Sequence, residues 1–425
     1  MDLLFYFLLL AVLTIVGIVL RRVIQNEKIF RFVFLVLAFI VLGSVSAFRY
    51  DVGFDYSYIY APLYEPIRLN PFISSSELVH EPGFVILQRL IALLSSDPQM
   101  LFIVTSYLIV GLLMLYFYLH SPAPVVSVFL FISLGQFYCS MNFIRQTLAG
   151  VICLFAIPML MRRKFWPYCA LVLLASLFHV SALIMLVFYV VNLIPIKANI
   201  LLIYVPVAVI LYLTSSGLIE LFTQFVYGHY DAYAPAVVLG FPVTALAILV
   251  FLFLLLFLNQ NILTQRDSKN HVYVNYAFFA MVFMFLGVRH SILNRFGLYF
   301  EFALPIGIAV MLSEWWRKFP SASEWWKDIK SKLPDAKRAA AIYAVCLVAV
   351  FGGSTAIHYH ILERDSHGVI PYRTIFDQPH YAGGAIFGWA GGALEEPESW
   401  LDDITQDVSA PEPENSFDDY REDET

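Results

Sequence analysis

Ten apolar runs recur along this 425-residue chain, and most of them are close to twenty residues long. A helix rises 1.5 Å per residue, so about twenty apolar residues span the hydrocarbon core of a bilayer. The composition agrees, with 60% hydrophobic and only 14% charged residues. We therefore predict an all-α fold, a polytopic integral membrane helical bundle with about ten full transmembrane helices. The runs are 2–20, 29–48, 99–119, 124–140, 141–160, 199–215, 237–258, 272–289, 296–315 and 339–357.

Basic residues between these runs predict the topology. Short loops rich in Lys and Arg stay on the cytoplasmic side of a membrane. One orientation, with the N-terminus outside, places all the basic loops on that side. These loops hold Arg21, Arg22 and Lys28, then Arg162, Arg163 and Lys164, then Arg266 and Lys269, and finally seven Lys and Arg residues in 317–338.

Two apolar segments do not fit ordinary spans. Residues 84–96 are too short to cross, so we expect a re-entrant or interfacial helix there. Residues 166–195 are too long for one crossing, and a single crossing would also move the basic loop 317–338 outside. We therefore expect a short helical hairpin over 166–195, with His179 at its tip on the outer side.

The chain divides by composition into a membrane domain and a tail. We assign residues 1–376 to a transmembrane domain with an outer loop at 49–83, and 377–425 to an extracytoplasmic C-terminal tail. From residue 395 onward the tail holds thirteen Asp and Glu and one Arg, so we expect it to be disordered. The four cysteines lie in or beside apolar runs without metal-site spacing, and we predict neither a metal site nor a cofactor.

Arginines collect on the predicted outer side, where basic charge is disfavoured. They are Arg49, Arg145, Arg289 and Arg295, and the outer loops up to residue 300 contain no lysine. The planar guanidinium binds phosphate through two parallel hydrogen bonds, so the set favours a pyrophosphate or another anionic headgroup. Each arginine alone is also compatible with a salt bridge to a loop carboxylate or with snorkelling. The outer tyrosines, Tyr56 among them, fit either an aromatic belt or stacking on sugar rings.

Several motifs along the chain together resemble a known family. They are "RYDVGFDYSYIY", "HEPGFVILQRL", "MNFIRQTLAG", "LLASLFHVSAL" and "NRFGLYFE", in this order, with "VIPYRTIF" near residue 376. They resemble the EpsG family of bacterial exopolysaccharide polymerases, related in role to Wzy O-antigen polymerases. The resemblance runs from about residue 30 to about residue 376. Phe54 and the acidic tail depart from the family pattern.

The resemblance implies a metal-independent glycosyltransferase of the bacterial cytoplasmic (inner) membrane, with its active site facing the periplasm or exterior. The donor would be a glycan on undecaprenyl pyrophosphate, and the acceptor a lipid-linked repeat unit. Membrane lipid, a chain-length regulator and a flippase are the implied partners, and nucleic acid is not one. His179 is the candidate base because imidazole titrates near neutral pH, with Asp55 and Glu81 as competitors. The predicted pyrophosphate- and glycan-binding residues are Arg49, Asp51, Tyr56, Arg145, Gln146, Arg289, Arg295, Tyr299 and Tyr372.

Three other classes of function stay open at the level of sequence. A transporter or flippase of lipid-linked sugars would need a polar path to the cytoplasm, but the inner halves of the runs carry almost no ionisable residue. A polysaccharide ligase would transfer the finished glycan to a different acceptor, and the sequence does not separate it from a polymerase. A non-catalytic scaffold gives no reason for outer arginines without lysines.

Overall fold

The structure is a computed structural model that describes residues 2–70, 81–226, 241–318 and 334–378. These residues form helices and no strand, apart from one isolated β-bridge between Arg49 and Thr374, so the all-α class is confirmed. The described helices are α1 (Asp2–Val23), α2 (Glu27–Ala47), the π-helix η1 (Tyr56–Tyr60), α3 (Ala61–Leu69), α4 (Pro82–Ala92), α5 (Gln99–His120), α6 (Pro124–Ser133), α7 (Gln136–Asn142), α8 (Ile144–Met161), α9 (Phe165–Ser176), the 3₁₀ helix η2 (Val180–Leu183), α10 (Ile184–Asn192), α11 (Ala198–Val226), α12 (Phe241–Leu258), α13 (Gln260–Leu263), η4 (Ser268–Asn270), α14 (His271–Gly287), α15 (Ser291–Glu301), α16 (Leu304–Lys318), α18 (Pro334–Glu363) and η5 (Ile375–Asp377).

Seven helical segments of the described chain are long and apolar enough to cross a membrane, or eight if the bent pair α6–α7 is one span. They are Leu3–Val23, Glu27–Ala47, Gln99–His120, Ile144–Met161, Ala198–Ser216, Ser268–Gly287 and Ile292–Arg317. The predicted count of about ten is not confirmed. The run 237–258 falls on α12, whose apolar part Val243–Leu258 is shorter, and the side chains in the first part of α18 are not described.

A bend separates α6 from α7 inside the predicted run 124–140. The two helices meet at 58° across Gly135, whose φ of +82° is in the left-handed region. An added Cβ at Gly135 would lie 2.5 Å from the Cδ1 atom of Ile361 on α18. Glycine is therefore required both by the backbone and by the close approach of α18.

The two unusual segments fold as short helices. α4 has 11 residues, too few to cross a bilayer, and begins with a proline in its first turn. Within 166–195 the chain turns back on itself between α9 and α10. The ring of Tyr189 on α10 lies 4.9 Å from that of Tyr168 on α9, and the Tyr168 hydroxyl donates to the Met185 carbonyl at 2.7 Å. The predicted hairpin is therefore present, and His179 lies at its break.

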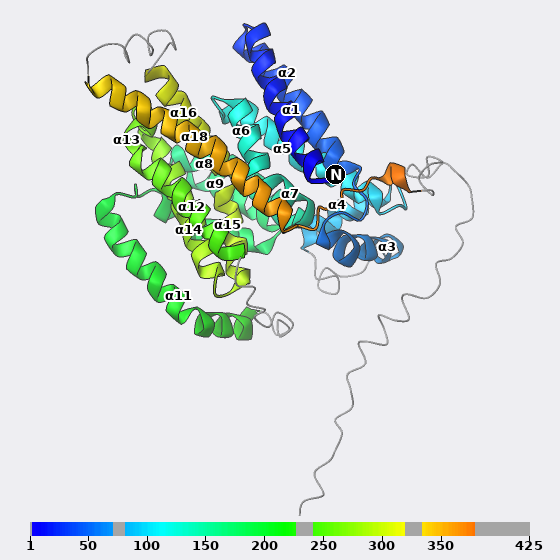
Figure 1. Cartoon of the computed structure of the whole chain (residues 1–425). Coiled ribbons are helices and arrows are strands. Elements are labelled where there is room, and N and C mark those ends of the chain that lie inside the picture. The colour runs from blue at the N-terminus through cyan, green and yellow to red at the C-terminus, as the bar shows by residue number, and fades with distance from the viewer. Residues whose placement is uncertain (1, 71–80, 227–240, 319–333, 379–425) are drawn as a thin grey trace, which may run out of the picture.

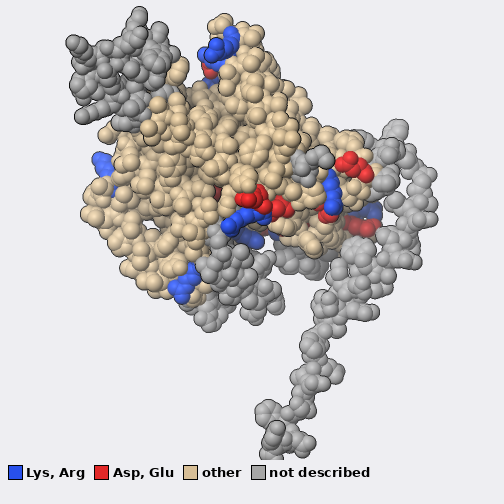
Figure 2. Space-filling model, viewed as in Figure 1, with Lys and Arg blue, Asp and Glu red and all other residues tan. Residues whose placement is uncertain are grey.

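Helices α8, α14 and α15–α16 form the centre of the bundle, and more than 70% of their apolar windows is buried. α1 and α11 lie at the periphery, and α18 runs obliquely across the bundle (Figure 1). Charged side chains occupy small patches on a largely uncharged face (Figure 2). This distribution is typical of a helical bundle surrounded by lipid.

The two ends of the bundle differ in their polar residues. At one end Arg31 donates to the carbonyl of Tyr118 at 2.7 Å, and a small cavity brings together Arg162, Asp267 and Lys269. At the other end α2 finishes and α5 and α8 begin, as shown by the 2.8 Å hydrogen bond from Gln99 Nε2 to the Ala47 carbonyl. Two of the predicted cytoplasmic basic residues, Arg162 and Lys269, therefore lie at one end of the bundle, together with Arg31.

Parts of four predicted regions lie outside the described residues. They are residues 71–80 of the outer loop 49–83, residues 227–236 of the loop 216–236, residues 319–333 of the basic loop, and the tail from residue 379 onward.

Candidate active site

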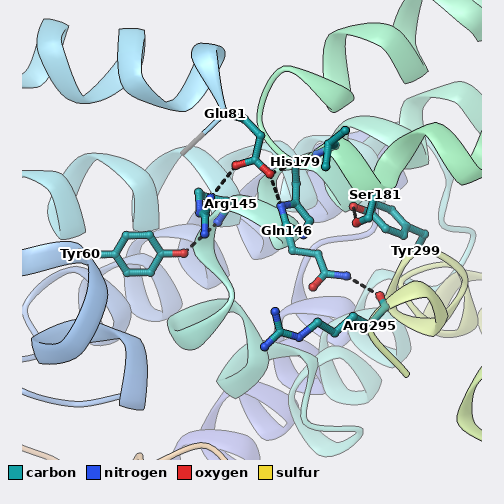
Figure 3. Close-up of polar contacts among 9 residues, drawn as sticks. Tyr60, Glu81, Arg145, Gln146, His179, Ser181, Arg295 and Tyr299 are labelled. Carbon is teal, nitrogen blue, oxygen red and sulfur yellow. Dashed lines mark hydrogen bonds and ion pairs between the residues drawn. The ribbon is translucent and has the colours of Figure 1, made fainter. Parts of the chain in front are cut away.

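Glu81 connects three segments that are far apart in the sequence. It occupies the N-cap position of α4, and its side chain is 13% exposed. Its Oε2 atom accepts a hydrogen bond from Arg145 Nη1 at 2.6 Å, and its Oε1 atom lies 2.6 Å from His179 Nδ1 (Figure 3). The backbone N–H of Val180 also donates to Oε1, at 3.2 Å. The carboxylate therefore fixes both the guanidinium and the imidazole.

The electrostatics of Glu81 follow from these contacts. Burial alone would raise the pKa of this carboxyl, but the hydrogen bond from His179 and the charges of Arg145 and His179 outweigh burial and lower it from 4.5 to about 2. Because the ionised carboxylate has no proton to donate, His179 Nδ1–H is the donor in this pair. The other ring nitrogen, Nε2, is then the one that can accept a proton.

Arg145 comes from the first turn of α8, immediately after the break at Phe143. The Tyr60 hydroxyl of η1 lies beside it and accepts from its backbone N–H at 3.4 Å. A π-helix widens the backbone by one residue per turn and often occurs at functional sites. Here η1 carries Tyr60 toward Arg145, as Figure 3 shows.

Gln146 links this cluster to Arg295 on α15. Its Nε2 atom donates a hydrogen bond to the Arg295 carbonyl (Figure 3). The Arg295 guanidinium lies 5.4 Å from the ring centroid of Phe143, within the range of a cation–π interaction. Tyr299, one turn further along α15, shares a 2.8 Å hydrogen bond with Ser181, which follows His179 by two residues.

Asp55 adds a second carboxyl near both arginines. Burial raises its pKa, and the charges of Arg295 and Arg145 oppose that rise. The structure thus brings together seven of the twelve predicted site residues. They are Asp55, Glu81, Arg145, Gln146, His179, Arg295 and Tyr299.

Arg49 is not part of this cluster. It is fully buried and donates to the carbonyls of Ser46, Val52 and Met141 and to the Ser106 hydroxyl, and its guanidinium lies 5.2 Å from the Phe102 ring centroid. Burial lowers its pKa to about 10. Its hydrogen-bonding groups are used to hold the end of α2 against α5 and α7.

Four further predicted residues also have other partners. Asp51 accepts from Ser57 and lies 3.7 Å from Arg373, and the buried Tyr56 hydroxyl donates to Gln99 at 2.5 Å. Arg289 donates to the carbonyls of Tyr212 and Leu213, both at 3.0 Å. The Tyr372 hydroxyl donates to the Val45 carbonyl at 2.8 Å. These contacts connect chain segments outside the cluster.

A cavity of about 310 Å³ adjoins the cluster at Gln146 and Arg295. Five polar residues that sequence reasoning missed line it: Gln136, Asn294, Glu301, His360 and His367. Burial lowers the pKa of His367 to about 4. The sequence did hold a signal for Glu301, since it is a carboxylate well inside the apolar run 296–315, whose other carboxylate, Glu314, stands at the end of the run.

Metal ligands are not grouped in the described part of the chain. No set of three or more His, Cys, Asp or Glu side chains there is arranged to hold a metal ion. The positive charges that lower the pKa values of the two site carboxyls are those of Arg145 and His179 for Glu81, and those of Arg295 and Arg145 for Asp55.

Comparisons with known proteins give one match. A family model described as the EpsG family matches residues 32–317. This range contains the whole cluster and most of the residues around the cavity. No curated protein matches the chain, and no solved structure matches it.

Proposed function

The chain belongs to the EpsG family, and we propose that it is a membrane glycosyltransferase that joins lipid-linked oligosaccharide repeat units into a polysaccharide. The donor is a glycan on undecaprenyl pyrophosphate, and the acceptor is the terminal sugar of a second lipid-linked unit. The observation that carries the proposal is the Glu81 carboxylate held between Arg145 and His179, with Arg295 nearby. The site thus offers an imidazole that can accept a proton, His179, and two guanidinium groups, Arg145 and Arg295, that can stabilise an anionic leaving group.

The reaction assigns a role to each of these groups. His179 Nε2 accepts the proton of the attacking acceptor hydroxyl, and Glu81 holds the imidazole in the tautomer that can do so. The acceptor oxygen bonds to the anomeric carbon of the donor as the bond from that carbon to the pyrophosphate oxygen breaks. The pyrophosphate departs with the bonding electrons, and Arg145 and Arg295 stabilise its charge in a poorly hydrated site.

The predicted orientation supports the outer face as the place of reaction. The cluster lies at the end of the bundle where α8 begins, opposite the end that holds Arg31, Arg162 and Lys269. Under the positive-inside rule this basic end is cytoplasmic. An impermeant maleimide in intact cells should then label Glu65→Cys, on the exposed surface of α3, and leave Lys327→Cys unlabelled. Labelling of Lys327→Cys would contradict the orientation.

A reconstituted reaction tests the activity itself. The purified protein in liposomes, given a defined undecaprenyl-pyrophosphate oligosaccharide, should produce a ladder of glycans spaced by one repeat unit. A single transfer to another acceptor would identify a ligase instead, and the absence of any longer glycan would refute glycosyl transfer.

Arg145→Lys tests the leaving-group assignment. A lysine supplies charge but not the bidentate fork, so the rate should fall by about 10²- to 10³-fold, the effect of removing one positioned donor. The matched control is Arg289→Lys, another predicted outer arginine whose partners are backbone carbonyls outside the cluster. It should retain the wild-type rate. Equal rates for both variants and the wild type would remove Arg145 from the mechanism.

A further inference from the structure

The cavity beside Arg295 has polar atoms whose hydrogen-bonding capacity the described protein leaves unused. Three buried atoms of residues that line it, Gln136 Oε1, Asn294 Oδ1 and His360 Nε2, have no hydrogen-bond partner among the described residues. The Glu301 carboxylate also lines the cavity and has no hydrogen bond or ion pair with any described side chain. Buried polar groups are normally paired, so such a concentration at one cavity indicates a ligand.

The orientation of Gln136 makes this lining rich in acceptors. Its Nε2 atom donates to the Glu301 carbonyl at 2.7 Å, which leaves the amide oxygen directed elsewhere and fixes the assignment of the two amide atoms. A carboxylate only accepts hydrogen bonds. Gln136 Oε1 therefore requires a ligand that donates hydrogen bonds, as does the Glu301 side chain in its ionised form, and an ionised phosphate oxygen does not donate.

The position of Glu301 also points to a ligand. It lies six residues after Arg295, about 9 Å deeper along a helix axis, within the span Ile292–Arg317. Carboxylates inside a membrane span are costly and usually mark a functional path. The remaining lining is mostly apolar, with Leu249, Leu252 and Ile361 among its residues. A sugar ring combines hydroxyl donors with apolar C–H faces, and this combination matches the lining.

We propose that this cavity is a subsite for one hydroxylated sugar ring of the glycan substrate, with Glu301 and Gln136 accepting hydrogen bonds from its hydroxyl groups. This assignment rests on the proposed function, and it identifies the residues that select the sugar. At about 310 Å³ the cavity is at the lower end of ligand-site volumes, so it takes one ring and not an oligosaccharide. Arg295, where the cavity meets the cluster, marks the boundary between the sugar and the phosphates.

Cys139 provides a reporter that does not depend on polymerisation. It is a free cysteine that lines the cavity and is 7% exposed, whereas Cys169 on α9 does not line it. Alkylation of both residues by a small maleimide can be followed by mass spectrometry in the wild-type protein in nanodiscs. The probes are methyl glycosides of common hexoses and N-acetylhexosamines, with inorganic pyrophosphate as the anionic alternative.

The proposal expects at least one methyl glycoside to slow alkylation of Cys139 about fivefold or more and to leave Cys169 unaffected. Glu301→Leu should weaken this protection about tenfold or more, since it removes a charged acceptor. Glu301→Gln, which keeps one acceptor oxygen and nearly the same shape, should fall between this variant and the wild type. Glu314→Gln, the same acid-to-amide change in a carboxylate that pairs with Arg317 and does not line the cavity, should behave as wild type.

Four results would overturn the subsite. They are failure of Cys139 to react without sugar, protection by pyrophosphate alone, protection that survives unchanged in Glu301→Leu, and lack of protection by any sugar while the wild type still forms polymer. In the last case the proposed function stands and only the subsite fails. Protection by a sugar without any polymer formation would have the opposite meaning, with the subsite supported and the proposed function refuted.

Discussion

Glu81→Gln tests whether the carboxylate organises the site. The displacement of its pKa from 4.5 to about 2 corresponds to about 3 kcal/mol in favour of the ionised form. The introduced amide has one acceptor oxygen for two donors, Arg145 and His179, so one of them must face the NH₂ group. If the imidazole does, its proton moves to Nε2 and the proposed base is lost. We expect the rate to fall by about 10²- to 10⁴-fold, the range of general base catalysis.

The assay is the initial rate of glycan extension at fixed donor and acceptor, measured between about pH 5 and pH 9. Asp51→Asn is the matched control, because it makes the same acid-to-amide change in a residue that pairs with Ser57 and Arg373 outside the cluster. Asparagine also tolerates the positive φ of 51° at this position. The double variant with His179→Gln should be no worse than the more damaging single change, since residues that act as a unit are not additive. A wild-type rate and pH profile for Glu81→Gln would refute the positioning role.

The direction of the pKa shift of Glu81 also sets the pH range in which this carboxylate is ionised. The pKa of Glu81 is lowered in the folded protein, so its stabilising contribution is complete above its ordinary pKa of 4.5 and is lost as the pH falls toward 2. Glu81 is therefore ionised throughout the neutral range. Any loss of rate between about pH 5 and pH 7 belongs to another group of the site.

Two further substitutions separate function from stability. Asp55→Asn should leave the thermal unfolding midpoint at neutral pH unchanged or higher, because burial raises the pKa of Asp55 and so makes its ionised form unfavourable in the folded state; a clear drop in the midpoint would contradict this reasoning. Arg49→Met should lower the free energy of unfolding by about 3 kcal/mol or more, since three backbone carbonyls lose a donor. Denaturation in detergent measures this free energy of unfolding. A variant that is as stable as the wild type but inactive would indicate that Arg49 binds substrate.

The helical class, the short helix near residue 84 and the break at His179 were predictable because each depends on apolar length alone. The bend at Gly135 was not, because it depends on α18 approaching from more than two hundred residues away. Local composition gave no sign of that contact. The count of spans also exceeded what the described helices support, because apolar runs do not reveal where a helix breaks.

The predicted topology placed the candidate site residues on the outer side, but it did not show which of them contact one another in a single cluster. Arg49 and Arg145 both follow or interrupt an apolar run and look equivalent in the sequence. They differ in their partners, since Arg49 donates to backbone carbonyls and Arg145 to a carboxylate that also holds a histidine. Glu301 lies within an apolar run and not in an outer loop, so a prediction built on the outer loops does not include it, although a carboxylate within a span is the stronger signal of function.

The placement of Arg145 is unfavourable for the helix that carries it, and this favours a functional role. An arginine at the centre of a bilayer costs about 2.5 kcal/mol or more, and a position at the start of α8 reduces that cost. There, however, the positive end of the helix dipole repels a cation. Glu81 offsets both effects at 2.6 Å, but its charge is shared with His179. Under the proposed function, an anionic group of the substrate would add to the stabilisation that Glu81 and Tyr60 already give to the Arg145 charge.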